Sequence, residues 1–373
     1  MIPGDQSTWD VRCLDVEVTS GCNLGCKYCY LGNPTASRMT SATADAVMQY
    51  LVRRAAKRQR SELNLYGGEP FLNFGGVQLL VESTKPSGMV HCTIFTNGAT
   101  ATPYQIEWCQ DRNVIPKRST GGCPEAAELT RPGNYTDRWL AEGVLWGDYG
   151  DTHRLAVTPA TAHLASQGVR WLHGEGYYGQ VDLATDDYTE WPTEALEAYE
   201  EQLDILADIF VREFLRGNVL GIENFSNFGR CIFGQPGIRV IGCGAGWNTW
   251  GITWDGRIVP CHRFFREPQE SPLCGGNIRG IISGQKVAFG SILPEKVRSW
   301  SRGVTLDQCK ECAAEQCCPR GCIHVSQATS GGLDASPEVR CRATRKYASV
   351  ARWINEKLDG GDWWQRPPTT CQF

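Results

Sequence analysis

The 373-residue sequence lacks three features that would narrow its function at once. No apolar run approaches the roughly 18 residues that a membrane-spanning helix needs, so we expect no membrane segment. The N-terminal stretch MIPGDQSTWD has no basic segment followed by an apolar one, which argues against a secretory signal and favours a cytoplasmic protein. The formal net charge is only −4, so neither a dominant nucleic-acid-binding role nor a membrane-surface role is indicated.

Cysteine, in contrast, is abundant, with 18 residues in the chain. In a reducing compartment, dense cysteine indicates metal binding or catalysis more often than disulfide bonds. The cysteines cluster at residues 22–29 and then mostly within residues 231–341, and this change in composition predicts a domain boundary near residues 217–230. The predicted parts are a first domain over residues 1–222, a second over residues 223–360 and a tail over residues 361–373.

The first part reads as alternating strands and helices, judged by apolar periodicity and by capping and turn residues. The predicted strands span residues 14–20, 62–70, 91–98, 113–120, 153–159 and 179–185. The predicted helices span residues 40–59, 77–84, 136–144, 160–173 and 192–216. Such alternation implies an α/β fold with a parallel sheet. About six strand–helix units are too few to close an eight-fold barrel, so we expect an open, partial (β/α)6 TIM-like barrel.

Loops of unusual composition follow the first four predicted strands. The cysteine-containing loop TSGCNLGCKYCYLGN (19–33) follows the first strand, and the stretches GGEP, TNG and STGG follow the second, third and fourth. In parallel α/β folds, ligands bind at the carboxyl ends of the strands. We therefore expect these four stretches to converge on one site.

The cysteine loop places Cys22, Cys26 and Cys29 within eight positions. A structural zinc site or an all-cysteine iron–sulfur cluster takes four ligands, so three thiolates leave one coordination position open. The CxxxCxxC spacing, the aromatic residue beside the last cysteine and the downstream GGEP together resemble the radical S-adenosylmethionine (radical SAM) superfamily. In that family, three cysteines hold a 4Fe–4S cluster whose fourth iron binds the amino and carboxylate groups of SAM. The alternative, a zinc site completed by a distant cysteine, does not account for the GGEP stretch.

The resemblance implies that residues of all four loops contact SAM. The expected SAM-binding residues are Tyr28, Gly67, Gly68, Glu69, Asn97, Ser119 and Arg131. By resemblance, Glu69 accepts from the ammonium group, Tyr28 contacts the adenine and Arg131 contacts the methionine carboxylate. Ser119 would contact the ribose and Asn97 the ribose or the substrate, although either can equally be a turn residue. The sequence departs from the family at Gly121, where the family has an aspartate.

The C-terminal part carries a second cysteine pattern, which resembles the seven-cysteine SPASM domain, a small cysteine-rich extension of many radical SAM enzymes. The seven positions are Cys243, Cys261, Cys309, Cys312, Cys318, Cys322 and Cys341. The resemblance implies two auxiliary 4Fe–4S clusters in addition to the SAM-binding one, although the same thiolates suit zinc as well. The distal cluster would use Cys309, Cys312, Cys318 and Cys341, and the nearer cluster would use Cys243, Cys261 and Cys322. The fourth ligand of the nearer cluster is Cys231, Cys274 or no protein residue.

Two candidate catalytic residues lie beside these motifs. The Asp-Gly dipeptide at residues 255–256 predicts a β-hairpin that would hold the first two SPASM cysteines near each other. His262, directly after Cys261, stands where the sulfatase-maturing branch usually has an aspartate base, and it is a candidate base here. Cys123, in the expected SAM-contacting loop, is the second candidate. Each also has an ordinary interpretation, as a hydrogen-bonded structural histidine and as a small buried thiol.

The resemblance implies an enzyme that cleaves SAM reductively to methionine and a 5′-deoxyadenosyl radical, which removes a hydrogen atom from a substrate. The two-part layout favours an oxidoreductase or maturase that modifies a peptide or protein; the alternative is the same chemistry on a small molecule or nucleoside. A low-potential electron donor such as flavodoxin or ferredoxin is an expected partner. Because the first strand begins near residue 14, we expect no N-terminal leader-binding domain. A separate leader-binding protein, or a surface such as the aromatic tail DWWQRPP (362–368), would then hold the substrate.

The three cysteine groups predict that the anaerobically reconstituted protein holds about twelve irons, four in each of three clusters. Iron, zinc and acid-labile sulfide would be measured per polypeptide. A value of about four irons would leave only the SAM-binding cluster. Zinc with little iron would contradict the cluster assignment of all three groups.

Overall fold

The computed structural model describes most of the chain. The described residues are 11–131, 152–177, 179–234, 244–289, 309–318, 321–330 and 336–368. Contacts between Cα atoms divide the chain into two compact units. The first unit comprises residues 1–25, 29–117 and 244–302, and the second comprises residues 26–28, 118–243 and 303–373. These compact units differ from the predicted functional parts, whose boundaries remain a prediction.

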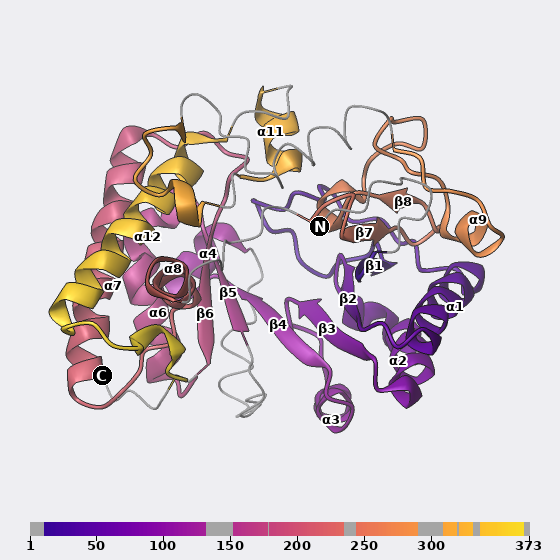
Figure 1. Ribbon diagram of the computed structural model, residues 1–373, viewed down its shortest axis with the longest axis horizontal. Helices are drawn as coiled ribbons and strands as arrows, with labels where there is room; N and C mark the ends of the chain where they lie inside the picture. Colours follow the sequence, from indigo (N-terminus) through magenta and orange to yellow (C-terminus); the bar gives the residue numbers. More distant parts are fainter. Residues whose placement is uncertain are drawn as a thin grey trace. The chain divides into compact units, whose positions relative to one another are not determined.

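The first unit is built on a sheet with the strand order β3-β2-β1-β7-β8 (Figure 1). Its strands are β1 (Cys13–Thr19), β2 (Ser61–Gly67), β3 (Val90–Thr96), β7 (Thr249–Ile252) and β8 (Ile258–Val259). β1 pairs in parallel with both β2 and β7, whereas β7 and β8 form the antiparallel hairpin predicted around residues 255–256. The hairpin thus continues the parallel sheet beyond β1, a position that the sequence did not predict.

Helices cover this sheet. They are α1 (Ser41–Ala56), α2 (Phe74–Thr84), α3 (Pro103–Asp111) and α9 (Ile278–Ile282), with the 3-10 turns η1 (Pro70–Asn73), η2 (Lys85–Ser87) and η4 (His262–Phe264). Figure 1 shows α1 and α2 side by side, and the two helices are in contact. α1 begins where predicted because the Thr40 side chain accepts a hydrogen bond from the Thr43 backbone N–H (3.1 Å). Its apolar stripe, which includes Val47 and Leu51, is buried.

The second unit contains the parallel strand pair β5 (Thr152–Val157) and β6 (Gln180–Thr185). β4 (Ile115–Thr120) begins in the first unit and ends in the second. The helices are α4 (Pro124–Thr130), α6 (Ala165–Gly174), α7 (Thr193–Leu215), α8 (Glu223–Phe233), α11 (Ile323–Ser330) and α12 (Glu338–Lys357). The 3-10 turns are η3 (Pro159–Leu164), η6 (Glu315–Cys317) and η7 (Trp363–Gln365). α12 packs against both α7 and α8 (Figure 1).

All of the predicted strands are confirmed, with ends shifted by a few residues. The predicted helix over residues 160–173 begins as the 3-10 turn η3 and continues as α6, and the one over residues 136–144 lies outside the described residues. The other predicted helices are confirmed. The sequence did not predict α3, α4, α8, α9, α11 or α12. For α3 a signal was present, because Thr102 and Gln105 form a capping box at its start.

The core of the second unit is aromatic. Phe210 of α7 packs edge to face against Phe225 of α8 and against Trp363 of η7, and all three are fully buried. The tryptophans of residues 362–368 therefore belong to the core, and their predicted role as a substrate-holding surface is wrong. The reason lies in Gly229 of α8: a Cβ there would lie 2.6 Å from the Trp363 ring, so glycine leaves the space that the indole fills.

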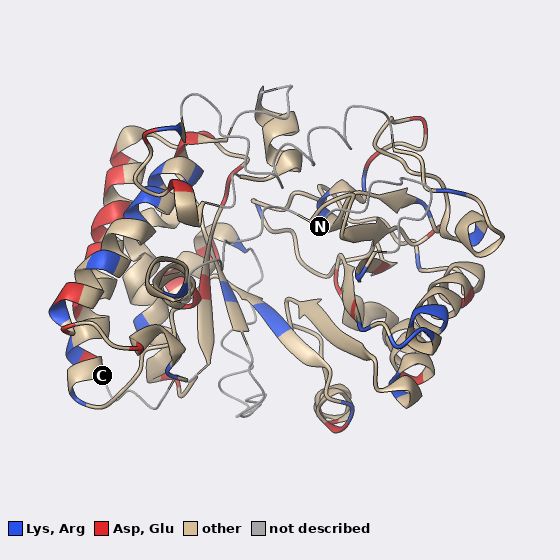
Figure 2. Ribbon diagram, in the orientation of Figure 1, with Lys and Arg blue, Asp and Glu red and all other residues tan. Residues whose placement is uncertain are grey.

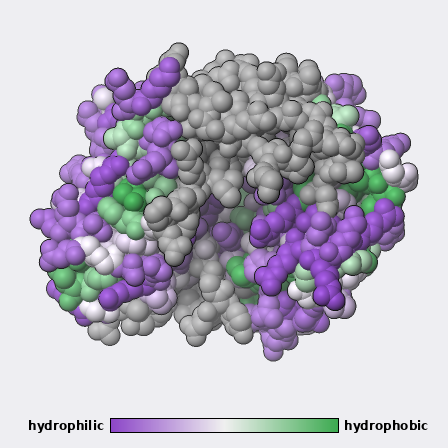
Figure 3. Space-filling model, in the orientation of Figure 1, coloured by the Kyte–Doolittle hydropathy of each residue, from purple (hydrophilic) through white to green (hydrophobic). Residues whose placement is uncertain are grey.

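The surface of the described residues is largely hydrophilic in the view of Figure 3, with small apolar patches. Among these residues, no helix is long and apolar enough to cross a membrane. Figure 2 shows acidic and basic segments side by side on α7 and α12. There Arg342 makes a two-pronged contact with Glu200 (2.7 and 2.6 Å), and Lys346 pairs with Asp204 (2.6 Å). Cross-helix ion pairs thus join the exposed sides of the two helices.

A polar cluster is buried in the second unit. His153 of β5, His173 of α6 and Arg118 of β4 are all buried. The Tyr177 hydroxyl accepts a hydrogen bond from the His153 backbone N–H (3.2 Å) and donates one to the Gln180 carbonyl (3.0 Å). Burial lowers the pKa of His173 to about 4, and burial together with the Arg118 charge lowers the pKa of His153 well below its usual value. Both imidazoles are therefore neutral near neutral pH.

The low pKa of His173 makes stability depend on pH. Its contribution is complete above the unfolded-state pKa of about 6.5 and is lost as the pH falls toward 4, because the unfolded chain binds the proton more tightly. Between about pH 7.5 and pH 5, the wild type should lose about 2 kcal/mol more unfolding free energy than a His173→Gln variant. Urea unfolding at the two pH values measures this difference.

His163→Gln is the control for this comparison, because His163 is exposed on η3. It should retain the pH dependence of the wild type. If His173→Gln also retains it, the buried imidazole is not the source of the acid sensitivity.

Candidate active site

Gly67 and Gly68, at the carboxyl end of β2, allow close approach of the cysteine loop. The Gly68 backbone N–H donates to the Thr19 carbonyl (2.9 Å), and the Glu69 backbone N–H donates to the Gly21 carbonyl (2.8 Å). A Cβ on either glycine would lie 2.3 Å from a backbone oxygen of β1 or of the cysteine loop. Only glycine fits at these two positions, which explains the first half of the GGEP stretch in structural terms.

Glu69 is fully buried and joins the ends of β2 and β3. Its Oε1 accepts hydrogen bonds from the Thr96 hydroxyl (2.7 Å) and from the Phe71 backbone N–H (3.1 Å). Its Oε2 accepts one from the Asn97 backbone N–H (2.7 Å). A carboxylate is stable away from water only when its oxygens are paired in this way. Glu69 therefore fixes the GGEP and TNG loops relative to each other.

Asn97 connects the third loop to the cysteine loop. Its side-chain amide donates to Oδ1 of Asn23 (3.0 Å) and lies 3.7 Å from the Cys22 sulfur. Its own Oδ1 accepts from the Ala99 backbone N–H (2.8 Å). Three of the four predicted loops thus meet at one edge of the sheet in the first unit, with Asn97 beside a thiol.

The three cysteines of the loop are accessible to a ligand. Cys22 and Cys26 are half-buried, Cys29 is exposed, and none of them forms a disulfide. Accessible thiols that lie close in sequence suit an iron–sulfur cluster in their chemistry. Among the described residues, no group of three or more His, Cys, Asp or Glu side chains is already arranged to hold a metal ion.

The fourth loop belongs to the second unit, as do residues 26–28 of the cysteine loop. The Lys27 backbone N–H donates to the Thr130 carbonyl at the end of α4 (3.0 Å). Arg131, directly after α4, has a buried guanidinium, and Ser119 is half-buried on β4. The segment that carries Tyr28 therefore lies next to the helix end that carries Arg131.

Gly121 and Cys123 both pack against α4. A Cβ at Gly121 would lie 2.5 Å from the Ala127 Cα, which accounts for glycine where the family has an aspartate. Cys123 precedes α4 and is buried with Ala126 and Leu164 in a small apolar cluster. Its thiol has the surroundings of a small hydrophobic side chain, and its catalytic role stays a prediction.

His262 is held against β1 and β2 in one orientation. Its Nδ1 lies 2.8 Å from Oδ2 of Asp15, and its backbone N–H donates to the same oxygen (3.1 Å). Its ring stacks on Tyr66 with ring centroids 4.3 Å apart, and Tyr66 stacks in turn on Phe95 at 4.1 Å. A hydrogen bond and a ring stack thus act on the imidazole together.

Asp15 is a buried carboxylate with partners for both oxygens. Its Oδ1 accepts from the Asn64 side-chain amide (2.9 Å), while its Oδ2 faces His262. Burial raises the pKa of Asp15, but the charge and hydrogen bonds of His262, with Asn64, bring it below its ordinary value. Burial, followed by the Asp15 charge, strongly raises the pKa of the neighbouring Cys13 thiol. The site therefore places an ionised carboxylate beside the imidazole and keeps the thiol protonated.

Glu17, two residues further along β1, holds the same segment by an ion pair. It is fully buried, and its Oε1 lies 2.5 Å from Nη1 of Arg266. Its Oε2 accepts from the Trp254 backbone N–H (3.3 Å). Burial raises the pKa of Glu17, and Arg266 offsets part of this rise. Residues 262–266 are thus fastened to β1 at both ends.

Three residues around His262 were not predicted from the sequence: Asp15, Glu17 and Tyr66. A signal for the first two is the strand LDVEV, in which carboxylates alternate with apolar residues although every position is buried. Carboxylates in a buried strand need partners, and the cationic segment HRFFR supplies them. Tyr66 carries no comparable signal, because aromatic residues are common in strands.

The cysteines of the predicted distal cluster all belong to the second unit. Cys309, Cys312, Cys318 and Cys341 are all half-buried. Burial raises the pKa of Cys341, and the charges of the other three raise it further, so Cys341 lies within their electrostatic reach. The set fits a four-cysteine cluster in number and in chemistry.

Cys231, one candidate for the fourth ligand of the nearer cluster, lies on α8 beside η6. Its thiol donates to the Gln316 carbonyl (3.4 Å). It also hydrogen-bonds to Cys317, whose pKa rises to about 12 through burial and through this contact. Cys317, which fits no position of the predicted pattern, is therefore the thiol partner of Cys231.

The remaining cysteines of the nearer cluster are only partly placed. Cys261 is buried after β8, and Cys322 is half-buried just before α11. Cys274, the second candidate for the fourth ligand, lies in the first unit with its sulfur 3.8 Å from the Gly276 carbonyl oxygen. Cys243 lies outside the described residues. The fourth ligand therefore stays open among Cys231, Cys274 and no protein residue.

Residues 16–114 match the family model described as Radical SAM superfamily. Among curated proteins, the radical SAM cyclopropyl synthase TigE of Paramaledivibacter caminithermalis is 25% identical over 121 residues. The aligned stretch covers 28% of this chain and 26% of TigE, so the chain matches about a quarter of the length of that relative.

Two solved structures share the fold over most of the chain. The structure of anSMEcpe with bound AdoMet has a TM-score of 0.75 at 18% identity, over 94% of this chain and 99% of anSMEcpe. Streptococcus suis SuiB bound to S-adenosylmethionine has a TM-score of 0.60 at 16% identity, over 89% of this chain and 77% of SuiB. anSMEcpe has also been solved with the Cp18Cys peptide, and SuiB with its precursor peptide SuiA. At these identities the likeness establishes the fold, and it confirms the predicted fold class.

Glu69→Gln should lower the unfolding free energy by about 2 kcal/mol. Both carboxylate oxygens accept hydrogen bonds from N–H or O–H groups, and the variant would replace one of these oxygens by an NH2 group, which cannot accept one. Urea unfolding measures the change. Glu62→Gln on the same strand is the control: Glu62 is 40% exposed and pairs with Arg12, so its loss should cost less than about 1 kcal/mol. Equal losses in the two variants would contradict the role of Glu69 as the joint between two loops.

Proposed function

We propose that the chain, in which residues 16–114 match the radical SAM family model, cleaves SAM reductively and removes a hydrogen atom from a peptide or protein substrate. The observation that carries this proposal is the meeting of three loops at the carboxyl ends of β1, β2 and β3. There Cys22 lies beside Asn97, and Asn97 is hydrogen-bonded to the buried Glu69. Parallel α/β folds bind their ligands at this edge.

Cys22, Cys26 and Cys29 would hold a 4Fe–4S cluster with one iron left for SAM. When bound, the cluster supplies the electron for the reductive cleavage of SAM, whose adenosyl fragment takes a hydrogen atom from the substrate. Gly68 brings the GGEP loop against the cysteine loop, so both loops would line the same side of SAM. Glu69 adds a negative charge that favours the nearby ammonium group, while its hydrogen bonds keep the two loops in place.

The other SAM contacts are proposed on the second unit. Arg131 would bind the methionine carboxylate, since a guanidinium shielded from water is a strong partner for that group. Tyr28 would contact the adenine and Ser119 the ribose. The hydrogen bond between Lys27 and Thr130 supports this set, because it places the segment of Tyr28 next to Arg131.

His262 is proposed as the residue that faces the substrate. Asp15 and Tyr66 fix its ring before any substrate binds, which reduces the entropy lost in reaching a reactive geometry. Asp15 acts through His262 and is therefore a positioning residue. Of the two candidate catalytic residues, Cys123 is the less suitable, because its thiol is enclosed in an apolar cluster.

The C-terminal cysteines would hold two auxiliary clusters, with Cys309, Cys312, Cys318 and Cys341 on the distal one. This part of the proposal is supported by the location of all four in the second unit and by the electrostatic effect of the other three on Cys341. Bound there, the clusters would give the protein a capacity to accept electrons, which suits a net oxidation of the substrate. A flavodoxin or ferredoxin would deliver the low-potential electron. A peptide or protein as substrate is supported by the peptides bound to anSMEcpe and SuiB, which share the fold.

Changing Cys22, Cys26 and Cys29 together to alanine should abolish reductive cleavage of SAM but leave about two thirds of the iron, because the auxiliary ligands lie elsewhere in the chain. The assay combines chromatography of 5′-deoxyadenosine with iron content per polypeptide. Cys92→Ala, at a buried cysteine of β3 outside the cysteine groups, is the control and should keep both properties.

Continued formation of 5′-deoxyadenosine by the triple variant would overturn the proposed function. Loss of nearly all iron from that variant would contradict the assignment of separate auxiliary clusters, even if cleavage were abolished.

A further inference from the structure

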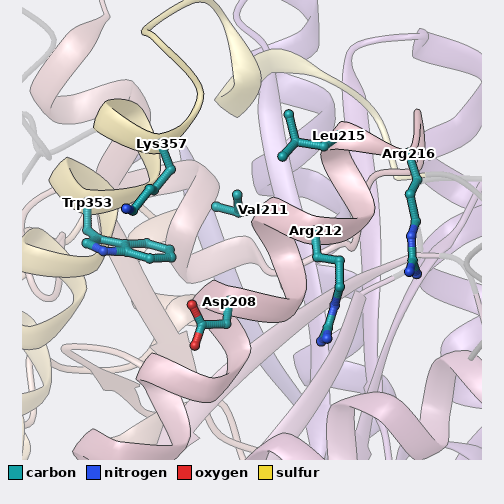
Figure 4. Close-up of a pocket in the computed structure, with 7 residues that line it drawn as sticks. All are labelled: Asp208, Val211, Arg212, Leu215, Arg216, Trp353 and Lys357. Carbon is teal, nitrogen blue, oxygen red and sulfur yellow. The ribbon is translucent and has the colours of Figure 1, made fainter.

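α7 and α12 border an open cavity of about 530 Å³ on the surface of the second unit (Figure 4). Asp208 and Arg212 lie four residues apart on α7, and Arg216 follows four residues later as the C-cap of the helix, with Val211 and Leu215 beside them. Residues 353 and 357 of α12 complete the lining. All of these residues belong to the second unit, and none of them belongs to the loops proposed to bind SAM.

One apolar side chain of the lining is highly accessible. Leu215 is 70% exposed, the largest exposed fraction of any large apolar side chain among the described residues. It lies beside the buried Val211, and the indole of Trp353 faces these residues from α12 (Figure 4). Leu215, Val211 and Trp353 thus form an apolar group that is bordered by charged side chains.

The charged part of the lining is predominantly positive. Arg212, Arg216 and Lys357 outnumber Asp208, which is the one acidic residue in the lining. Arg216 pairs with Glu213 (2.7 Å), and the Lys357 ammonium lies 5.6 Å from the centre of the Trp353 ring. Within the part of the chain that the structure describes, neither Arg212 nor Lys357 forms an ion pair with a carboxylate.

This surplus of positive side chains contrasts with the preceding turns of the same two helices, where the charges are paired. There each cation of α12 that faces α7 has a carboxylate partner: Arg342 pairs with Glu200, and Lys346 pairs with Asp204. The series of pairs ends at the cavity, where cations are left over beside an exposed leucine. The arrangement is complementary to a ligand that carries carboxylates next to an apolar side chain.

We propose that this cavity docks an acidic, amphipathic segment of the peptide or protein substrate. The inference rests on the proposed function for the class of substrate and adds the surface that holds it. Carboxylates of the segment would pair with Arg212, Arg216 and Lys357, and an apolar side chain would cover Leu215. Docking at a second point raises the effective concentration of the reacting part at the active site without any new contact there.

An electron donor is a less suitable occupant. Cys341, a proposed ligand of the distal cluster, lies twelve residues before Trp353 on α12, which corresponds to about 18 Å along the helix axis. A redox partner needs a much closer approach to a cluster for rapid transfer. The cavity is therefore better placed to hold a segment of the substrate than to receive electrons.

The test uses a fluorescein-labelled peptide that repeats the unit Glu-Glu-Leu-Leu as the probe. Its binding to the full-length, cluster-loaded protein would be measured by fluorescence anisotropy without SAM or reductant. Charge reversal in the double variant Arg212→Glu/Lys357→Glu should weaken binding at least about tenfold, and Leu215→Ser should weaken it severalfold. A peptide with lysine in place of glutamate should bind at least about tenfold more weakly to the wild type.

The matched control is Lys57→Glu/Arg60→Glu, which makes the same change in charge at exposed residues beyond the end of α1 in the first unit. Its affinity for the probe should stay within about twofold of the wild type. Equal weakening in the two double variants would show that overall charge causes the effect, and it would overturn the proposal. Equal binding of the acidic and basic peptides would overturn it as well.

A second measurement separates the substrate from the electron donor. Reduction of the clusters by a reduced flavodoxin would be followed spectroscopically in the wild type and in Arg212→Glu/Lys357→Glu. Unchanged reduction with weakened peptide binding supports the proposal, and slowed reduction with unchanged peptide binding overturns it. Because the binding assay needs no SAM cleavage, failure of the proposed reaction and failure of the docking surface give different results.

Discussion

Two buried carboxylates on β1 determine how distant parts of the sequence fit together in the first unit. Asp15 holds His262, and Glu17 holds Arg266. Removing one member of such a pair would leave an uncompensated charge away from water, which is costly enough to make the pairing obligatory. The position of Cys261, directly before His262, follows from the same anchoring. A proposed cluster ligand and a proposed substrate contact are thus set by the strand that also leads into the cysteine loop.

Around this anchor, the active-site loops are positioned mainly by backbone contacts. Gly67 and Gly68 permit the GGEP loop to lie against the cysteine loop, and Glu69 transmits that position to Asn97. Each of these contacts depends on a residue that tolerates little change. At the two glycines there is no space for a side chain, and at Glu69 the Asn97 backbone N–H has no other hydrogen-bond acceptor in the described contacts. The chemistry proposed for the site would therefore act on a framework that is held by contacts within the chain itself.

Much of the fold and part of the site could be predicted because the governing interactions are local. The cap of Thr40 and the apolar stripe of α1 belong to one helix. The turn residues of the hairpin of β7 and β8 are consecutive in the sequence. The meeting of the loops follows from the general rule for parallel sheets. The pairing of Asp15 with His262 joins residues 247 positions apart, and no local pattern selects that partner. The burial of Trp363 likewise depends on the space above a glycine of another helix.

The parallel pairing of β1 with β7 has a consequence for how the protein can be divided. Residues Cys13 to Val16 are in register with Thr249 to Ile252, so one side of β1 is covered by residues that come more than 230 positions later. A fragment that ended near residue 222 would leave that side as a bare sheet edge, with an apolar strand whose N–H and C=O groups invite another chain. The cysteine-rich part of the sequence therefore also covers one edge of the sheet. A chain shortened in this way would be prone to aggregate.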